Sequence, residues 1–153
     1  MIAENGIAID AIVSDFISGA VEWLSPDNDR DHWDIIEGQG SLFHPSFAGV
    51  SLGLLHGSQP DAFIVCHEPT RTQMRGVEAA LPSIGDVIEQ TVQCGKLTNK
   101  NIHCIGIALN TSNMKNNKSD IKKEISSQYQ LPCIDPITDN LDPFIDLLEK
   151  IND

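Results

Sequence analysis

Short apolar runs rich in β-branched residues alternate with longer amphipathic segments along the chain, and this alternation most limits what the chain can fold into. Such runs are typical of strands buried on both faces of a parallel sheet, with helices formed by the segments between them. We therefore expect an α/β fold with three layers and a doubly wound, mainly parallel sheet. The expected strands are Gly6–Ile12, Trp33–Glu37, Ala62–Cys66, Ile102–Leu109 and Pro132–Ile134, and the expected helices are Asp15–Leu24, Pro45–His56, Ile84–Cys94, Ser119–Tyr129 and Pro143–Ile151.

Length and charge narrow the class of protein. The 153 residues suit a single α/β domain over residues 1–153. A net charge of -12 disfavours nucleic acid as a partner. No apolar run approaches the roughly 18 residues of a membrane-spanning helix, and the start lacks the features of a signal peptide, so we expect a cytoplasmic protein without a membrane partner. The turn-like pair Asn5-Gly6 has little sequence before it, which suggests part of a longer protein.

Ligands of parallel α/β sheets bind outside the carboxyl ends of the strands. The expected strands bring five groups of polar residues or glycines to that edge. They are Asp10, residues 37–41, residues 66–68, residues 110–112 and residues 135–136.

The sequence "IIEGQGS" is the first candidate site. Gly38 and Gly40 allow a ligand to approach the backbone, and the N-terminus of the expected next helix favours an anion. Similar turns without a ligand are common in α/β proteins, which is the alternative. Inside that helix, Gly49, Gly53 and Gly57 form one bare stripe, which we expect to pack closely against the sheet or a second subunit rather than a ligand.

The sequence "VCHEPTR" begins a second candidate site and a long loop over residues 67–82. His67 or Glu68 is a candidate proton acceptor, and Arg71 and Arg75 are candidate ligands of a substrate carboxylate. Cys66 and His67 are adjacent in a strand and point to opposite faces, so adjacency does not make them a catalytic pair. The alternative is a disordered surface loop.

Two familiar motifs are absent from the sequence. The histidines at positions 32, 44, 56 and 67 include no short ligand pair, so we expect no metal site. Gly95-Lys96 lacks the remaining residues of a phosphate-binding Walker A loop and is expected to follow a helix rather than precede one.

Four stretches carry a resemblance over nearly the whole chain. They are "GIAIDAIVSDFISGAVEWL", "HWDIIEGQGSLFHPSFAGVSLGLLHGSQPDAFIVCHEPTR", "IGIALNTS" and "LPCIDP". They resemble the C-terminal part of a family long catalogued as a domain of unknown function, some of whose members are assigned as D-glutamate N-acetyltransferases. The resemblance implies a P-loop NTPase-type fold, similar in layout to dethiobiotin synthetase, with the phosphate-binding loop in an N-terminal half outside this chain.

The resemblance also implies roles for individual residues. Glu37-Gly38 resembles the acidic strand end beside a phosphate loop, and Asn110 resembles a strand-end asparagine that faces a nucleotide base. We assign Asn110 and Asp135 to a nucleotide or cofactor site. The implied reaction is acetyl transfer from acetyl-CoA to the amino group of an acidic D-amino acid.

For this reaction we expect Glu37 or His67 as the base, and Arg71 and Arg75 as carboxylate ligands. The backbone amides that would stabilise the oxyanion belong to Gly38, Gln39, Gly40 and Ser41. The expected partners are a small-molecule substrate and further copies of the chain in a homo-oligomer, and we expect this chain alone to be inactive.

Two alternatives remain open. One is a P-loop ligase or kinase that uses ATP or GTP with Mg²⁺. The other is a non-catalytic assembly domain that associates through the glycine stripe.

Overall fold

The computed structural model of the protein describes residues 6–29 and 31–151. Contacts divide them into two units: unit 1 holds the described residues up to Pro60 together with Gln90–Ile102, and unit 2 holds Asp61–Glu89 and the described residues from His103 onward. The elements, in chain order, are η2 (Ile9–Ala11), η3 (Ser14–Phe16), α1 (Ile17–Leu24), α2 (Ala48–Ser58), β1 (Ala62–His67), α3 (Ile84–Gly95), β2 (His103–Leu109), α4 (Lys118–Tyr129), β3 (Cys133–Ile134) and α5 (Asp142–Glu149).

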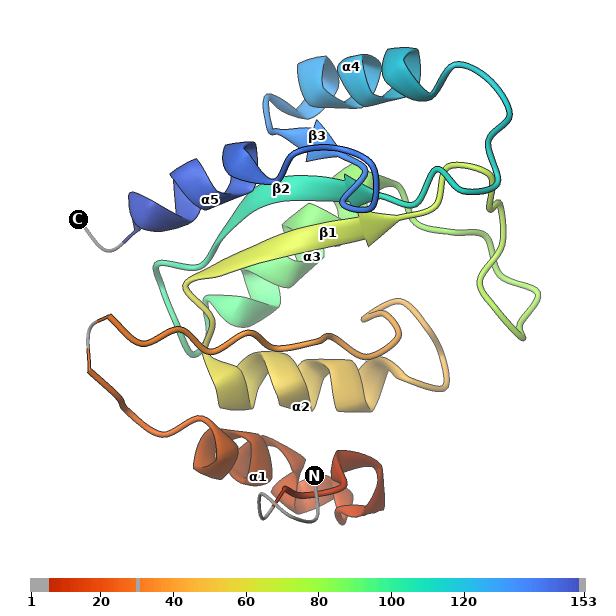
Figure 1. Ribbon diagram of the computed structural model, residues 1–153. Coiled ribbons are helices and arrows are strands. Elements are labelled where there is room, and N and C mark those ends of the chain that lie inside the picture. Colours follow the sequence, from red (N-terminus) through yellow and green to blue (C-terminus); the bar gives the residue numbers. More distant parts are fainter. Residues whose placement is uncertain (1–5, 30, 152–153) are drawn as a thin grey trace. The chain divides into compact units, whose positions relative to one another are not determined.

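The described part of unit 2 is built on a parallel sheet with the strand order β1-β2-β3 (Figure 1). Val65 pairs with Ile107 and His67 with Leu109, whereas the β2–β3 ladder joins only Ile107 to Cys133 and Ala108 to Ile134. Because all three strands run in one direction, their carboxyl ends lie at one edge. The expected α/β fold with a parallel sheet is thereby confirmed.

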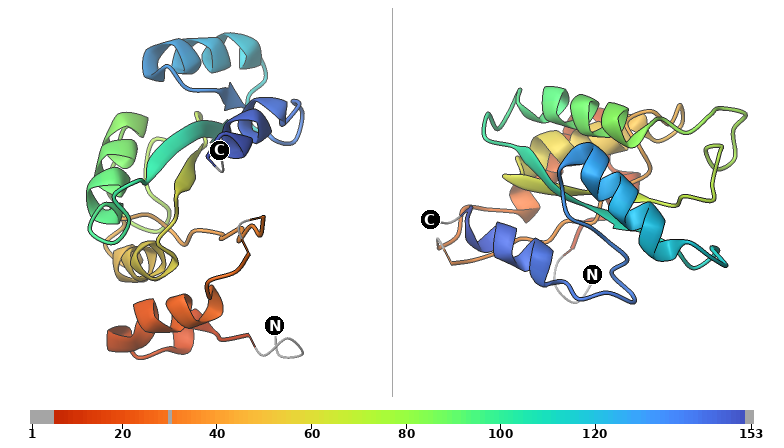
Figure 2. Two further views of the ribbon diagram at one scale, coloured as in Figure 1. Left: turned by 90° about the vertical axis from the view of Figure 1, so that its left-hand side faces the viewer. Right: turned by 90° about the horizontal axis from the view of Figure 1, so that it is seen from above.

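Helices cover both faces of this sheet (Figure 2). On one face, Val65, Ile107 and Leu109 pack with Ile84 of α3 and Ile125 of α4. On the other face, Ala108 and Ile134 pack with Phe144 of α5. Apolar residues on both faces of β2 explain why its sequence is a continuous apolar run rather than an alternating one. The arrangement is the expected three-layer, doubly wound one.

In unit 1 the glycine stripe of α2 packs against α1. A Cβ atom on Gly53 would lie 2.4 Å from the Ile17 side chain, and one on Gly57 would lie 2.3 Å from the backbone oxygen of Ser18. A Cβ on Gly49 would meet nothing within 4 Å. The expected close packing is therefore present at two of the three glycines, and the neighbour is α1 rather than the sheet or a second subunit.

Two expected strands are absent from the described residues. Gly6–Ile12 contains the 3-10 helix η2, so Asp10 does not follow a strand. Trp33–Glu37 joins no strand ladder in the described part of the chain, and Ile35 is 84% exposed. A strand requires the hydrogen-bonding groups of a neighbouring strand, which a local apolar pattern does not supply. The expected turn at Asn5-Gly6 includes a residue outside the described ranges.

The helices agree with expectation apart from their ends. The helix expected from Pro45 starts as α2 at Ala48, because residues 45–47 form turns in which the Phe47 amide donates to the His44 carbonyl oxygen. Pro143 lies in the first turn of α5, where a missing N–H is tolerated. Among the described residues, each helix is too short or too polar to cross a membrane.

Candidate functional site

The carboxyl ends of β1 and β2 bring candidate residues of unit 2 together. β1 ends at His67 and β2 at Leu109, and these two residues pair in the ladder. The Asn110 amide then donates to the His67 carbonyl oxygen at 2.9 Å, which carries the pairing one residue past β2. The predictions placed His67 and Asn110 at one edge, and the structure brings them together there.

Glu68 is the centre of a polar cluster at this edge. Its Oε1 accepts hydrogen bonds from Asn113 Nδ2 at 2.7 Å and from Thr70 Oγ1 at 3.1 Å. Its Oε2 pairs with Arg71 Nη2 at 2.8 Å. The hydrogen bond from Asn113 is the largest of the causes that lower the pKa of the Glu68 carboxyl below its ordinary value of 4.5, followed by that from Thr70. Glu68 is therefore an anion held by three donors, which is a poor starting point for a proton acceptor.

His67 is better suited to accept a proton. Desolvation of the ring lowers the pKa of His67 below its ordinary value of 6.5, the nearby Arg71 charge lowers it further, and Glu68 acts in the opposite direction. The imidazole is therefore neutral at pH 7 and can act as a base. Desolvation raises the pKa of the adjacent Cys66 thiol above 9.0, so this cysteine is a thiol rather than a nucleophilic thiolate at neutral pH.

The loop after β1 is ordered by an internal antiparallel bridge. Gln73 pairs with Ala80, and the Met74 amide donates to the Ala79 carbonyl oxygen at 2.8 Å. Gly76 takes a φ of +77° in the tip between them. Arg71 precedes this bridge and is fixed by Glu68, whereas Arg75 lies in the tip and is exposed. The two arginines predicted to bind a carboxylate thus occupy different parts of the loop, and Arg71 is tied to the polar cluster at the strand end through Glu68.

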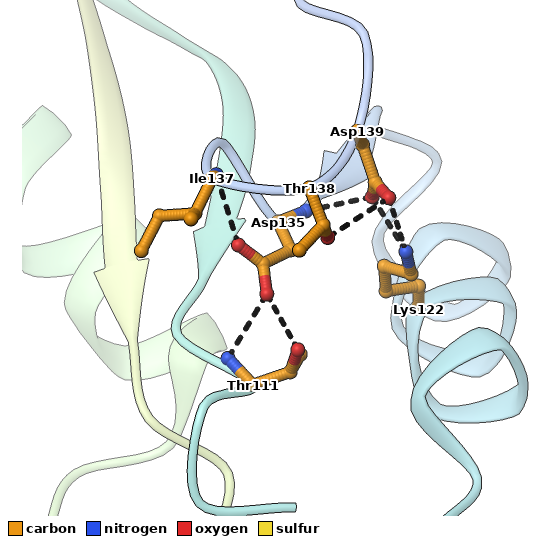
Figure 3. Close-up of polar contacts among 6 residues, drawn as sticks. All are labelled: Thr111, Lys122, Asp135, Ile137, Thr138 and Asp139. Carbon is orange, nitrogen blue, oxygen red and sulfur yellow. Dashed lines mark hydrogen bonds and ion pairs between the residues drawn. The ribbon is translucent and has the colours of Figure 1, made fainter.

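Asp135 follows β3 and is buried, and Figure 3 shows the hydrogen-bond donors around its carboxylate. Its Oδ2 accepts hydrogen bonds from Thr111 Oγ1 at 2.5 Å and from the Thr111 amide at 3.3 Å. Its Oδ1 accepts from the Ile137 amide at 3.0 Å. The hydrogen bond from the Thr111 hydroxyl is the largest cause that lowers the pKa of Asp135 below 3.8. Both carboxylate oxygens therefore have donors from within the chain.

Asp139 holds the turn that follows β3. Its carboxylate pairs with Lys122 Nζ on α4 through both oxygens, at 2.7 and 2.5 Å. The Asp135 amide also donates to Asp139 Oδ2, at 2.8 Å. The hydrogen bond from Lys122 is the main cause that lowers the pKa of Asp139 below 3.8. This ion pair connects α4 to the turn in which Asp135 lies.

The predicted residues of unit 1 lie in an exposed extended segment. Glu37, Gly38, Gln39 and Gly40 are exposed and Ser41 is half-buried. The Gln39 carbonyl oxygen lies 3.1 Å from Ser51 Oγ on α2, and Ser41 Oγ accepts a hydrogen bond from the Phe43 amide.

The two glycines in this segment differ in what surrounds them. A Cβ on Gly40 would stand 2.7 Å from the Cβ of Phe47, whereas one on Gly38 would meet nothing within 4 Å. Neither glycine has a positive φ, the conformation that most often requires glycine. Packing therefore explains the glycine at position 40, and neither packing nor backbone conformation explains the one at position 38.

The structure thus groups His67, Arg71, Asn110 and Asp135 at the strand ends of unit 2. Glu37 and residues 38–41 belong to unit 1, so the prediction that all of them share one edge stays a prediction. Sequence reasoning missed the part played by Thr111 and Asn113, which hold the two carboxylates. Their signal is the polar run "NTSN" directly after a buried strand. Among the described residues, no three His, Cys, Asp or Glu side chains are grouped so as to hold a metal ion.

Comparisons with known proteins place this geometry in context. A family model described as "Domain of unknown function (DUF1611_C) P-loop domain" matches residues 1–145. A D-glutamate N-acetyltransferase from a Pseudoalteromonas species is 50% identical over 147 residues, which are 95% of this chain and 44% of that protein. One from Tritonibacter scottomollicae is 41% identical over 153 residues, which are 99% of this chain and 46% of that protein. The chain spans less than half the length of these curated relatives.

A solved structure agrees with the fold. The crystal structure of a DUF1611 family protein from Anabaena variabilis is 29% identical and matches with a TM-score of 0.82, over 97% of this chain and 44% of that one. The resemblance noted in the sequence is thereby confirmed at the level of family and fold.

Proposed function

The chain belongs to the DUF1611_C P-loop domain family, and from this membership we propose that it is part of an enzyme that transfers the acetyl group of acetyl-CoA to the amino group of D-glutamate. The observation that carries the proposal is the name shared by two relatives that are 50% and 41% identical over almost the whole chain. The polar cluster at the strand ends of unit 2 supports it, because it combines a neutral imidazole with an anchored guanidinium.

The reaction defines what the site has to supply. The amino nitrogen of D-glutamate loses a proton to a base and attacks the thioester carbonyl carbon, so a C–N bond forms and negative charge develops on the carbonyl oxygen. The C–S bond then breaks and the coenzyme leaves as a thiolate that takes up a proton. Besides the base, such a site requires hydrogen-bond donors for the oxyanion and cations for the two carboxylates of the acceptor.

In unit 2, His67 is the base of this proposal and Arg71 is the carboxylate ligand. Glu68 holds one nitrogen of the Arg71 guanidinium and leaves the other donors of that group for a substrate carboxylate. Arg75 is exposed in the tip of the same loop and is the second carboxylate ligand of the proposal. For unit 1, taken by itself, Glu37 stays the alternative base and the amides of residues 38–41 stay the predicted oxyanion donors.

The test is an acetyltransferase assay on the complete protein that carries this sequence. Free thiol released from acetyl-CoA is measured with D-glutamate, with L-glutamate as the matched control acceptor. We expect thiol release with D-glutamate that is lost when His67 is replaced by glutamine. Absence of thiol release with both acceptors, from a folded protein, would reject the proposal. Activity that survives in His67→Gln and is lost in Glu37→Gln would assign the base to Glu37.

A P-loop ligase or kinase is the second candidate, and the family's description as a P-loop domain favours it. Such an enzyme would require ATP or GTP with Mg²⁺, and acetyl transfer requires neither. A thermal-shift experiment separates the two. A ligand that binds only the folded state at about 100 times its Kd adds roughly 2.7 kcal/mol to the free energy of unfolding. Stabilisation by acetyl-CoA alone supports acetyl transfer, and stabilisation by ATP with Mg²⁺ alone supports the second candidate.

A further inference from the structure

The loop Asn110–Asn113 is held from both sides by carboxylates that follow the neighbouring strands. On the β1 side, Glu68 accepts a hydrogen bond from Asn113 at 2.7 Å. On the β3 side, Asp135 accepts hydrogen bonds from both the hydroxyl and the amide of Thr111. Two carboxylates thus fix one four-residue loop. Glu68 lies 45 residues before Asn113 in the sequence, and Asp135 lies 24 residues after Thr111.

The contact that holds this loop on the β3 side is buried, whereas the first residue of the loop, Asn110, is exposed. Asp135 is 2% exposed and Thr111 is 1% exposed, so the contact between them is closed to solvent. Asn110 is exposed, and its side-chain Oδ1 accepts a hydrogen bond from the Ser112 amide. A ligand at the strand ends can therefore reach Asn110, while Asp135 has its two oxygens occupied inside the fold.

We propose that Asp135 is a positioning residue, which acts through Thr111 and together with Glu68 fixes the loop Asn110–Asn113 so that the exposed Asn110 side chain is in place to contact the donor substrate. This assignment replaces the direct ligand contact that the sequence suggested for Asp135. It rests on the proposed function for the identity of that donor, acetyl-CoA. The holding of the loop itself does not depend on the donor.

The hydrogen bonds explain why a carboxylate is needed at position 135. Its Oδ2 faces two donors of Thr111 and its Oδ1 faces the donor of Ile137. An asparagine has only one acceptor oxygen, so its NH₂ group would face an N–H or O–H donor on one of the two sides. Asp135→Asn therefore keeps the volume and breaks one side of the contact.

The first experiment measures hydrogen exchange in the complete protein without ligand. We expect Asp135→Asn to raise the exchange rate of the amides in residues 110–114 by about tenfold, the change that loss of one buried hydrogen bond to a charged group produces. The amides of β2 are expected to keep their protection. Asp139→Asn is the matched control, because Asp139 accepts hydrogen bonds from the Asp135 amide and Lys122 in the same turn, and its partners in the described part of the chain do not include Thr111. Unchanged exchange of residues 110–114 in Asp135→Asn would overturn the proposal whatever the reaction is.

The second experiment separates positioning from a general loss of stability. Asp135→Asn and Thr111→Val are expected to raise the KM for acetyl-CoA by about tenfold with an unchanged KM for D-glutamate. Thr111→Ser retains the hydroxyl and is expected to restore the wild-type KM. If Asp135→Asn does not fold, the Thr111 pair carries the test.

The kinetic results distinguish the role of the loop in donor binding from the proposed function as a whole. Faster exchange of the loop with an unchanged KM for acetyl-CoA would overturn the role in donor binding. An equal rise of both KM values, or no rescue by Thr111→Ser, would also overturn it. A wild-type protein that releases no thiol from acetyl-CoA rejects the proposed function instead, and the exchange experiment still decides whether Asp135 holds the loop.

Discussion

Gly57 and Ser18 are in backbone contact: a Cβ atom at position 57 would lie 2.3 Å from the Ser18 carbonyl oxygen. Backbone atoms cannot move aside as a flexible side chain can, so Gly57→Ala has to push α1 and α2 apart. We expect the free energy of unfolding to fall by about 1 to 3 kcal/mol, the usual effect of overpacking. Chemical denaturation of the purified variant measures this loss.

Gly49→Ala is the matched control on the same helix. Nothing lies within 4 Å of a Cβ at position 49, so the alanine meets no clash. We expect the free energy of unfolding to rise by about 0.5 to 1 kcal/mol, because alanine has the higher helix propensity. Equal destabilisation by the two substitutions would show that the α1–α2 contact is not the reason for the glycines.

The sequence predicted the elements whose evidence is local. β1, β2 and β3 are apolar runs that the sheet buries, and α3, α4 and α5 lie within a few residues of their expected ranges. The two wrong strands show the limit of this reasoning. Trp33–Glu37 contains the apolar residues Trp33, Ile35 and Ile36, yet it joins no ladder among the described residues. Whether an apolar run becomes a strand depends on its neighbours in space, which are not visible in the run itself.

The sequence predicted where the residues of the candidate site lie along the sheet, but it did not predict which side chains contact one another. The rule that ligands bind at the carboxyl ends of parallel strands placed His67 and Asn110 at one edge, as observed. The same rule suggested Asp135 as a ligand residue without showing that Thr111 occupies its carboxylate. Those two residues are 24 apart in sequence, and only the register of β2 against β3 brings them together.

Gly38 and Gly40 allow a test of the oxyanion donors proposed in unit 1. A side chain at position 38 meets open space, so we expect Gly38→Ala to unfold at the wild-type temperature. If the backbone there contacts the substrate, the alanine methyl group should keep the substrate from the N–H donor, and kcat/KM should nevertheless fall by about a hundredfold, as for loss of one oxyanion donor. Gly40→Ala should instead lower the unfolding temperature, because its Cβ would stand 2.7 Å from that of Phe47. Wild-type kcat/KM in Gly38→Ala would remove the donor role.

The proposed base role of His67 has a pH signature. Its pKa lies below 6.5, and the base must be neutral, so kcat/KM should be constant at neutral pH and fall as the pH drops through that pKa. Arg71 lowers the pKa of His67, and removing its charge should move the acid limb of the profile to higher pH. The pH dependence of kcat/KM for wild type and Arg71→Ala measures the shift, and NMR titration of the His67 ring is the independent check. An acid limb that stays in place in Arg71→Ala would contradict this assignment.

The ion pair between Lys122 and Asp139 has a signature in acid stability. The pKa of Asp139 is lowered in the folded protein, so its contribution to the free energy of unfolding is full above the unfolded value of 3.8 and is lost as the pH falls through the folded value. We expect Lys122→Met to cost about 1 kcal/mol at neutral pH and to weaken the pH dependence below about pH 4. Urea unfolding at several pH values measures both effects. Lys123→Met, on the exposed neighbour, should leave both unchanged.

Arg71 and Arg75 are both exposed and occupy different parts of the loop after β1. Glu68 fixes the Arg71 guanidinium at 2.8 Å, and a group already held in place loses less freedom when it binds a substrate carboxylate. Arg71→Ala should therefore raise the KM for D-glutamate by about tenfold or more, and Arg75→Ala tests the second predicted ligand in the same assay. Steady-state kinetics at saturating acetyl-CoA measure both, and Arg71→Lys, which keeps the charge without the planar fork, should recover only part of the loss. An unchanged KM for D-glutamate in Arg71→Ala would remove its role as a carboxylate ligand.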